Sequence, residues 1–296
     1  MAQKLGPLVH LWGIDPTQIP TQSASGAEVT PLLTGLLSEA LPFIDELPAG
    51  QDSSSSSWKF RKSYSYASSA APVEVFEKKI PPDAMRSVAA EYKDQLPQVT
   101  KAATAETWFL RRSVHEDAAQ PKTASWDEFV ASFKQHHAES EKAFTETVVG
   151  TTPGREWDCS GVAVQLGDET WVDWTLKLEE SVHKLPFPLQ KRVFPVLQAT
   201  AAVEGRREFV VVQVFYTGGP AEENAKGTVT GAYTSIERIR ELPGGETGGK
   251  KQIEWVMGTA SDAMGILPEF VQVMATPDMV PKDVDFFLSW VVKQRK

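Results

Sequence analysis

The chain has 296 residues, of which 41% are hydrophobic and 23% are charged. It is therefore long enough to bury a sizeable core as one large domain or two small ones. The formal net charge of −9 at pH 7 argues against nucleic acid as a partner, because phosphate binding needs a basic surface. A single cysteine, Cys159, rules out an internal disulfide and fits a reducing compartment. No apolar stretch approaches the roughly 20 residues of a membrane span, so we expect a cytoplasmic protein without stable membrane insertion.

The N-terminal part of the chain predicts a helix followed by a linker. Apolar residues recur at helical spacing from Ala27 to Leu47, and Pro48–Ser57 is rich in serine. We therefore divide the chain into an N-terminal helical extension with its linker, residues 1–57, and a main domain, residues 58–296. The linker is either a domain boundary or a loop that leads into the first strand, and the second interpretation is the simpler one.

The main domain reads as strands interrupted by few helices. Alternation of apolar and polar residues predicts strands at Trp58–Tyr66, Val73–Ile80, Thr107–His115, Thr170–Glu179, Arg192–Ala199, Glu208–Thr217, Val229–Arg240 and Gln252–Ser261. Helices are expected at Ala84–Gln95, after the capping box Ser125-Trp-Asp-Glu128, and from Phe270 to Val291, beyond the N-cap candidates Ser261 and Asp262. This order predicts an α+β fold with helices on one face of a curved antiparallel sheet and a long C-terminal helix across it.

Such a sheet and helix can enclose a ligand cavity, which we expect to be largely apolar and several hundred Å³ in volume. The Pro-rich segment that contains Phe187 is a candidate lid over this cavity. The other expected walls are large side chains of the late strands and of the C-terminal segment, namely Trp174, Phe215, Tyr233, Trp255, Met257, Phe270 and Met274.

The strand Thr107–His115 carries the strongest candidates for a polar centre. Phe109, Arg111 and His115 share one face. Inside a cavity, Arg111 would anchor an anion or carbonyl and His115 would carry a proton. The alternative is that this face is solvated, or that Arg111 only pairs with a carboxylate such as Glu128 or Asp262. On the functional interpretation, replacing Arg111 or His115 by alanine should abolish ligand retention and leave the melting temperature nearly unchanged.

Weaker candidates have simpler structural explanations. Glu179 and His183 are close enough along the chain to pair, but the polar face of their strand is expected to face solvent. His137 and Glu141 have a spacing that can begin a metal site, but no third ligand follows, so no metal is expected. Nucleotide-binding and hydrolase motifs are absent, and no cofactor is predicted.

Several segments follow a recognisable order along about two thirds of the chain: Trp108–His115, Thr123–Phe129, His137–Glu141 with Phe144, His183–Pro186 with Arg192 and Phe194, Phe209–Gln213, Tyr233–Arg238, Glu254–Asp262 and Lys282–Trp290. Together they resemble the fungal DUF3074 family, which is placed among the START-like (helix-grip, Bet v 1-like) proteins. One departure from the family pattern is Gly258, where the family motif has Ala.

The resemblance implies a curved antiparallel sheet that grips the C-terminal helix around a tunnel, but it implies no established reaction. START-like domains bind lipids, sterols, polyketides or hormones, and some are enzymes. The leading expectation is that the chain binds a hydrophobic small molecule or lipid, with His183 among the contacts. The alternative is a secondary-metabolite enzyme, a cyclase, isomerase or dehydratase that works by acid–base chemistry in the same cavity. A single Arg or Tyr that anchors a head group would favour the carrier, whereas a positioned His or Glu beside an Arg would favour the enzyme.

Overall fold

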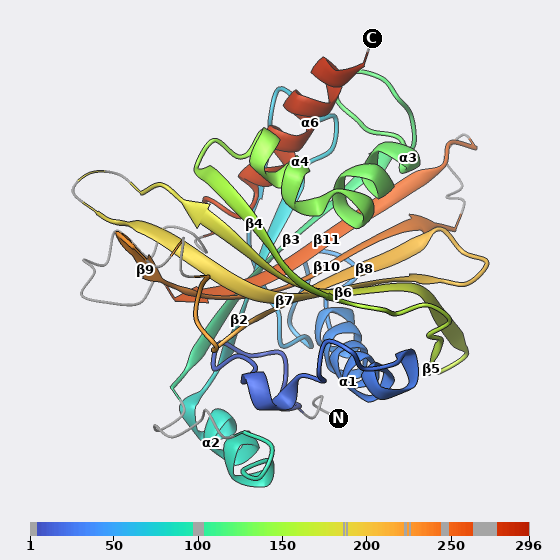
Figure 1. Ribbon diagram of the computed structural model, residues 1–296. Coiled ribbons are helices and arrows are strands. Elements are labelled where there is room, and N and C mark those ends of the chain that lie inside the picture. The colour runs from blue at the N-terminus through green and yellow to red at the C-terminus, as the bar shows by residue number, and fades with distance from the viewer. Residues whose placement is uncertain are drawn as a thin grey trace.

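The computed structural model describes residues 5–96, 104–185, 187, 189–221, 224, 226–243, 249–262 and 277–295. A single curved sheet dominates the molecule, with helices above and below it (Figure 1). No helix in these ranges is long and apolar enough to cross a membrane.

The sheet has 11 strands and is antiparallel except for one short pair. Its main path runs β1-β2-β3-β11-β10-β8-β7-β6-β4, while β5 pairs with β6 and β9 lies parallel to β7. The strands are β1 (Lys59–Tyr64), β2 (Val73–Ile80), β3 (Glu106–Glu116), β4 (Val148–Trp157), β5 (Val164–Leu166), β6 (Glu169–His183), β7 (Lys191–Val203), β8 (Glu208–Phe215), β9 (Thr228–Thr230), β10 (Ala232–Leu242) and β11 (Gln252–Asp262).

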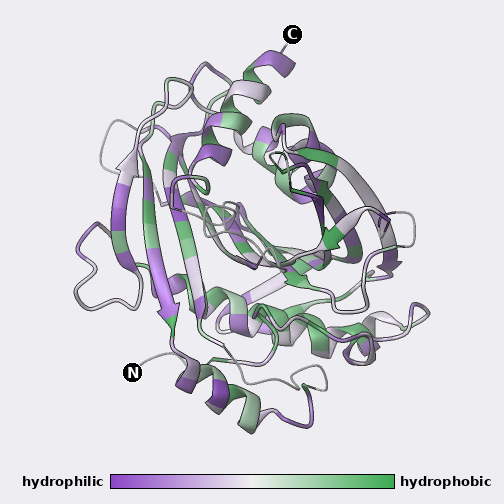
Figure 2. Cartoon of the chain, turned by 90° about the vertical axis from the view of Figure 1, so that its left-hand side faces the viewer, coloured by the Kyte–Doolittle hydropathy of each residue, from purple (hydrophilic) through white to green (hydrophobic). Residues whose placement is uncertain are grey.

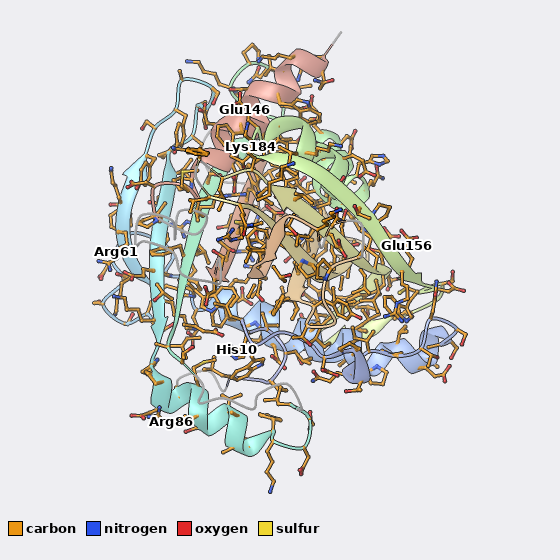
Figure 3. All side chains as sticks on the ribbon, turned by 60° about the vertical axis from the view of Figure 1, so that its left-hand side comes forward. His10, Arg61, Arg86, Glu146, Glu156 and Lys184 are labelled. Carbon is orange, nitrogen blue, oxygen red and sulfur yellow. The ribbon has the colours of Figure 1, made fainter. Side chains whose placement is uncertain are left out.

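One face of the sheet, here called the outer face, is covered by the N-terminal helix α1 (Gly26–Asp45). Buried residues of α1, such as Leu33 and Leu37, join Trp108, Leu110 and Val256 of the sheet in one hydrophobic cluster. The preceding segment is tied to the start of β3, because the carboxylate of Glu106 bonds His10 Nδ1 at 2.8 Å and accepts the backbone N–H of Leu11 at 2.7 Å. His10 lies on this side of the sheet in Figure 3. The short helices η1 (Pro16–Gln18) and α2 (Pro82–Glu91) complete the N-terminal part of the chain.

The opposite, inner face is covered by α3 (Trp126–Phe129), the π-helix η2 (Val130–Gln135), α4 (His137–Phe144) and the C-terminal helix α6 (Lys282–Gln294). The sheet curves around these helices (Figure 2). Phe133, Phe287 and Trp255 meet here in an aromatic cluster, with ring centroids 4.8–5.4 Å apart. The α+β, START-like helix-grip arrangement is therefore present. The expectation of helices on only one face of the sheet is wrong, because α1 buries its apolar residues against the outer face.

Several predicted elements differ from those observed. The helix expected after Ser125 is three segments, since a π-helix and the non-helical backbone of His136 interrupt it. The strand expected at Val229–Arg240 is two, β9 and β10, separated at Gly231. Ser261 and Asp262 are the last residues of β11 and pair with β10, and the helix start that they were expected to cap lies outside the described residues.

The edge strand β4 was not predicted at all. It contains Gly150, Pro153 and Gly154 and its pairing with β6 shifts register twice. Proline and glycine of this kind are tolerated at a sheet edge, where one side needs no hydrogen bonds. The regular alternation that reveals other strands is therefore absent from β4.

Burial on both faces overturns the idea that one face of β3 is solvated. Trp108 and Leu110 pack towards α1, while Arg111 and His115, each 1% exposed, lie on the inner face. Alternation along the strand therefore separates an apolar outer surface from a partly polar inner one.

Candidate functional site

Two adjoining pockets open between the inner face of the sheet and helices α4 and α6. Their empty volumes are about 430 and 460 Å³ when space open to solvent is included, and they share four residues, His137, Glu141, Gln213 and Tyr233. Pocket 1 is also lined by Ala138, Thr151, Glu179, Ser181, His183, Phe194 and Val196. Pocket 2 is also lined by Arg111, Phe133, Phe144, Thr145, Val211, Ser235, Glu237, Met257 and Asp283.

Arg111 is the centre of a buried ionic network in pocket 2. Its Nη2 donates to Glu237 Oε1 at 3.2 Å, and its Nε lies 3.7 Å from Asp283 Oδ2. The guanidinium stacks on Trp255, with Cζ 3.8 Å from the ring centroid, and the Trp255 Nε1–H donates to the same Glu237 oxygen at 2.6 Å. A planar, delocalised cation suits this combination of stacking and hydrogen bonding better than a lysine would.

His137 and Glu141 face both pockets from successive turns of α4. Burial opposes protonation of His137, but hydrogen bonding to Glu237 and the charges of Glu141, Glu237 and Glu179 outweigh it and raise the imidazole pKa. Burial raises the pKa of Glu141 to about 7; nearby Asp283, Glu179 and Glu237 add to this effect and His137 opposes it. Glu141 therefore titrates in the range useful for proton transfer, next to an imidazole whose pKa is raised.

The carboxylates of Glu237 and Asp283 have opposite shifts. Burial would raise the pKa of Glu237, but its contacts with His137, Arg111 and Trp255 hold that pKa below its usual value. Desolvation raises the pKa of Asp283 to about 6, assisted by Glu237 and resisted by Arg111. Arg111 thus favours the ionised form of both carboxylates, but it outweighs desolvation only at Glu237, where His137 and Trp255 assist it.

At the other end of the cavity, β6 presents Glu179, Ser181 and His183 at alternate positions of pocket 1. His183 Nε2 is 3.0 Å from Ser181 Oγ, while its buried Nδ1 has no hydrogen-bond partner among the described residues. Burial lowers the His183 pKa to about 4, so this imidazole is neutral at physiological pH. The prediction that the polar face of this strand meets solvent holds for Asp173 and Thr175, which are exposed, but is wrong for Glu179, which is buried.

His115 lies on the same face as Arg111 but lines neither pocket. Its ring is 5.9 Å from Phe129 and 6.2 Å from Trp255, and its Nε2 is 2.8 Å from Ser113 Oγ. Burial, followed by the charge of Arg111, lowers its pKa to about 4. His115 is therefore a neutral side chain that packs against Phe129 and Trp255, outside both pockets.

The expected pocket walls are only partly brought together. Tyr233, Met257 and His183 line the pockets, and Trp255 lies under the Arg111 guanidinium. Phe270 and Met274 lie outside the described residues. Phe109 is half-buried and lines neither pocket.

Three of these wall assignments need correction. Trp174 packs in the outer-face cluster, because an irregularity in β6 near Asp173, whose φ is +54°, turns both Trp171 and Trp174 towards α1. Phe215 is buried against the backbone of Gly13, away from both pockets. Phe187 is 98% exposed and closes over nothing.

The lining of both pockets is mainly apolar, as expected, but four carboxylates, Glu141, Glu179, Glu237 and Asp283, also line them. The i, i+4 spacing of His137 and Glu141 was a usable signal that was set aside, as was the pair Glu179 and His183. Glu237 and Asp283 gave no sequence signal of their own. Among the described residues, no group of three or more His, Cys, Asp or Glu side chains is arranged to hold a metal ion.

The family model described as "Protein of unknown function (DUF3074)" matches residues 108–291, more than half of the chain. The chain belongs to this family. The matched DUF3074 region contains β3, the inner-face helices and nearly all of α6, and so every residue that lines the two pockets. No curated protein matches the chain in sequence.

The solved structures similar to this DUF3074 protein include START-domain proteins. Human STARD10 has a TM-score of 0.47 and 14% identity, over 86% of this chain and 79% of its own. Human StAR-related lipid transfer protein 5 has a TM-score of 0.47 and 14% identity, over 90% of this chain and 95% of its own. The STAR-related lipid transfer protein from Xanthomonas axonopodis has a TM-score of 0.42 and 12% identity, over 80% of this chain and 98% of its own.

Proposed function

We propose that this protein binds a small amphipathic organic molecule in the cavity formed by the two pockets. The observation that carries the proposal is the presence of buried polar atoms, among them Arg111 Nη1 and the Nδ1 atoms of His137 and His183, that line the cavity and have no hydrogen-bond partner among the described residues. Leaving a buried polar group unsatisfied costs about 1–3 kcal/mol. A ligand that bonds to these atoms recovers that cost, so they support a polar group on the ligand.

Apolar side chains on the remaining walls support an apolar part on the same molecule. Phe194 and Val196 line pocket 1, and Phe144, Val211 and Met257 line pocket 2. Cavities of this kind, with apolar walls and a few convergent polar groups, are typical of small-molecule sites. We assign contact roles to Arg111, His137, His183, Tyr233 and Met257, and a supporting role to Trp255.

Binding of the neutral, environment-sensitive dye Nile red tests this proposal. The wild-type protein should bind the dye with increased fluorescence, and Ala138→Phe should reduce the affinity at least tenfold, because Ala138 is buried on α4 and lines pocket 1. The matched control is Ala119→Phe on an exposed loop, which should bind like the wild type. Dye binding that both variants leave unchanged would refute the cavity as the binding site.

If Ala138→Phe lowers stability, Thr151→Trp offers a second way to fill the same pocket from the edge strand β4, where the side chain is half-buried. The two variants introduce a large side chain from two different elements, α4 and β4. Loss of dye binding in both variants, with cooperative melting retained, would identify the cavity as the binding site. Mass spectrometry of molecules extracted from the native protein then identifies the natural ligand.

Acid–base catalysis on the bound molecule is a second candidate, favoured by the pair His137 and Glu141. A carboxyl group with a pKa of about 7 next to an imidazole with a raised pKa is suited to move protons at neutral pH. The extracted ligand should then be converted to a product on incubation with wild-type protein. Glu141→Gln should bind the molecule but leave its mass and isomer composition unchanged. An identical outcome for both proteins would leave binding as the function.

A further inference from the structure

Four carboxylates line the cavity, and Glu141 differs from the other three in having no paired cation. Glu179 Oε2 lies 3.1 Å from Lys177 Nζ, Glu237 Oε1 lies 3.2 Å from Arg111 Nη2, and Asp283 Oδ2 lies 3.7 Å from Arg111 Nε. The side chain of Glu141 forms no hydrogen bond or salt bridge with any residue that the structure describes. It nevertheless belongs to both pockets and so stands where they meet.

Two other polar groups of pocket 1 offer atoms that can accept hydrogen bonds and that no described residue uses. His183 is 6% exposed, and in the tautomer that donates from Nε2 to Ser181 its partnerless Nδ1 is a lone-pair acceptor. Glu179 is also 6% exposed, and its Oε2, although close to Lys177, lacks hydrogen-bond geometry. A ligand group that enters here must therefore supply hydrogen-bond donors.

An anionic group fits this cavity poorly. The Arg111 guanidinium already faces both Glu237 and Asp283, and His137 Nε2 is 3.7 Å from Glu237 Oε2. A further negative charge would lie among four carboxylates, at a cost that grows in a partly desolvated site.

We propose that the ligand carries a protonated primary amine, which binds between the carboxylate of Glu141 and the acceptors of Glu179 and His183. This inference rests on the proposed binding function and adds the chemical class of the ligand. An ammonium group has three donors and no acceptor, which matches the acceptor-rich wall of pocket 1.

The electrostatic environment of Glu141 agrees with this assignment. The groups that face it are His137 on its own helix, Glu179 and His183 on β6, Tyr233 and Glu237 on β10, Arg111 on β3 and Asp283 on α6. Burial and three of these carboxylates raise the pKa of Glu141 to about 7. The surrounding negative charges therefore favour a positive charge at this carboxyl group, and in the absence of another cation a proton supplies it. A bound ammonium would lower that pKa, and binding near pH 6 should therefore release a proton.

Isothermal titration calorimetry with n-octylamine, n-octanol and sodium octanoate at pH 7 tests the inference. Wild-type protein should bind octylamine at least tenfold more tightly than octanol, and octanoate more weakly than both. Titrations of octylamine at pH 6 in two buffers of different ionisation enthalpy should show net proton release. Glu141→Gln should remove the preference for octylamine over octanol. Glu139→Gln, exposed on the same helix, should behave like the wild type.

The possible outcomes separate this inference from the proposed function. Preference for octanoate would assign Arg111 as an anion anchor and overturn the amine. Equal binding of octylamine and octanol, or no binding of octylamine while Nile red still occupies the cavity, would also overturn the amine and leave the binding function standing. Nile red fluorescence that Ala138→Phe does not reduce would remove the binding function itself. Glu179→Gln is a second variant that should reduce the preference for octylamine over octanol.

Discussion

At the residue scale, Arg111 is both a candidate ligand contact and a structural group. It is 1% exposed, stacks on Trp255 and faces Glu237 and Asp283. The sequence-based expectation that alanine at this position leaves the melting temperature unchanged is therefore revised. Removing one partner of a buried ionic network leaves an uncompensated charge, which typically costs about 3–5 kcal/mol.

Arg111→Ala should thus lower the free energy of unfolding by about 3–5 kcal/mol, measured by urea denaturation at pH 7. Adding Glu237→Gln should restore part of this loss, since it removes one of the stranded charges. The control is Arg86→Ala, because Arg86 and its partner Asp83 are 55% and 88% exposed, and its loss should cost less than about 1 kcal/mol. Equal, small losses for both arginines would show that the network contributes nothing to stability.

Glu141 makes a prediction about pH. Its pKa is raised from 4.5 to about 7 in the folded state, so between these values the folded protein holds a proton that the unfolded chain has released. Stability contributed by this group is therefore present below pH 4.5 and is lost as the pH rises towards 7. Glu141→Gln should be more stable than the wild type at pH 8, by about 1–3 kcal/mol, and nearly equal to it at pH 4.

Thermal and urea denaturation at these two pH values measure the difference. Glu139→Gln on the exposed face of the same helix serves as the control and should show no such divergence. A Glu141→Gln variant that is less stable than the wild type at pH 8 would contradict the assignment of a proton to this carboxyl group.

At the element scale, α1 is part of the molecular core. Leu33 is fully buried among sheet residues of the outer face, whereas the adjacent Leu32 is only partly buried. Leu33→Ala should lower the free energy of unfolding by about 2–5 kcal/mol, as is usual for a large-to-small change in a core. Leu32→Ala should cost clearly less, and similar losses at both positions would mean that α1 is not docked on this face.

At the scale of the whole molecule, α1 and the sheet should unfold together. They share one continuous hydrophobic cluster, and Arg238 of β10 pairs with Asp45 at the end of α1 at 2.7 Å. Native-state hydrogen exchange should therefore give α1 amides nearly the same opening free energy as those of β10 and β11. Opening of α1 at a much lower free energy would instead support residues 1–57 as a separate unit from residues 58–296.

Local patterns in the sequence were sufficient for most elements and for the fold class. The strand Val73–Ile80 was predicted with the bounds observed, and β3, β8 and β11 to within about two residues, because alternation over such lengths reports directly on a pleated strand. The helical spacing of apolar residues in α1 likewise predicted a helix that buries one face. Irregular elements such as β4 could not be predicted, because glycine, proline and bulges interrupt the alternation of apolar and polar residues.

The sequence by itself determined that β3 has an apolar face and a polar face, and that Arg111 and His115 share the polar one. Only the tertiary structure decided that both faces are buried, that Arg111 reaches the cavity and that His115 does not. It also brought Glu237, Asp283, Glu141 and Glu179 together from β10, α6, α4 and β6. The reason is physical: alternation tells which side chains share a face, but the partner of each face, and therefore its dielectric and its charge neighbours, is set by elements distant in the chain.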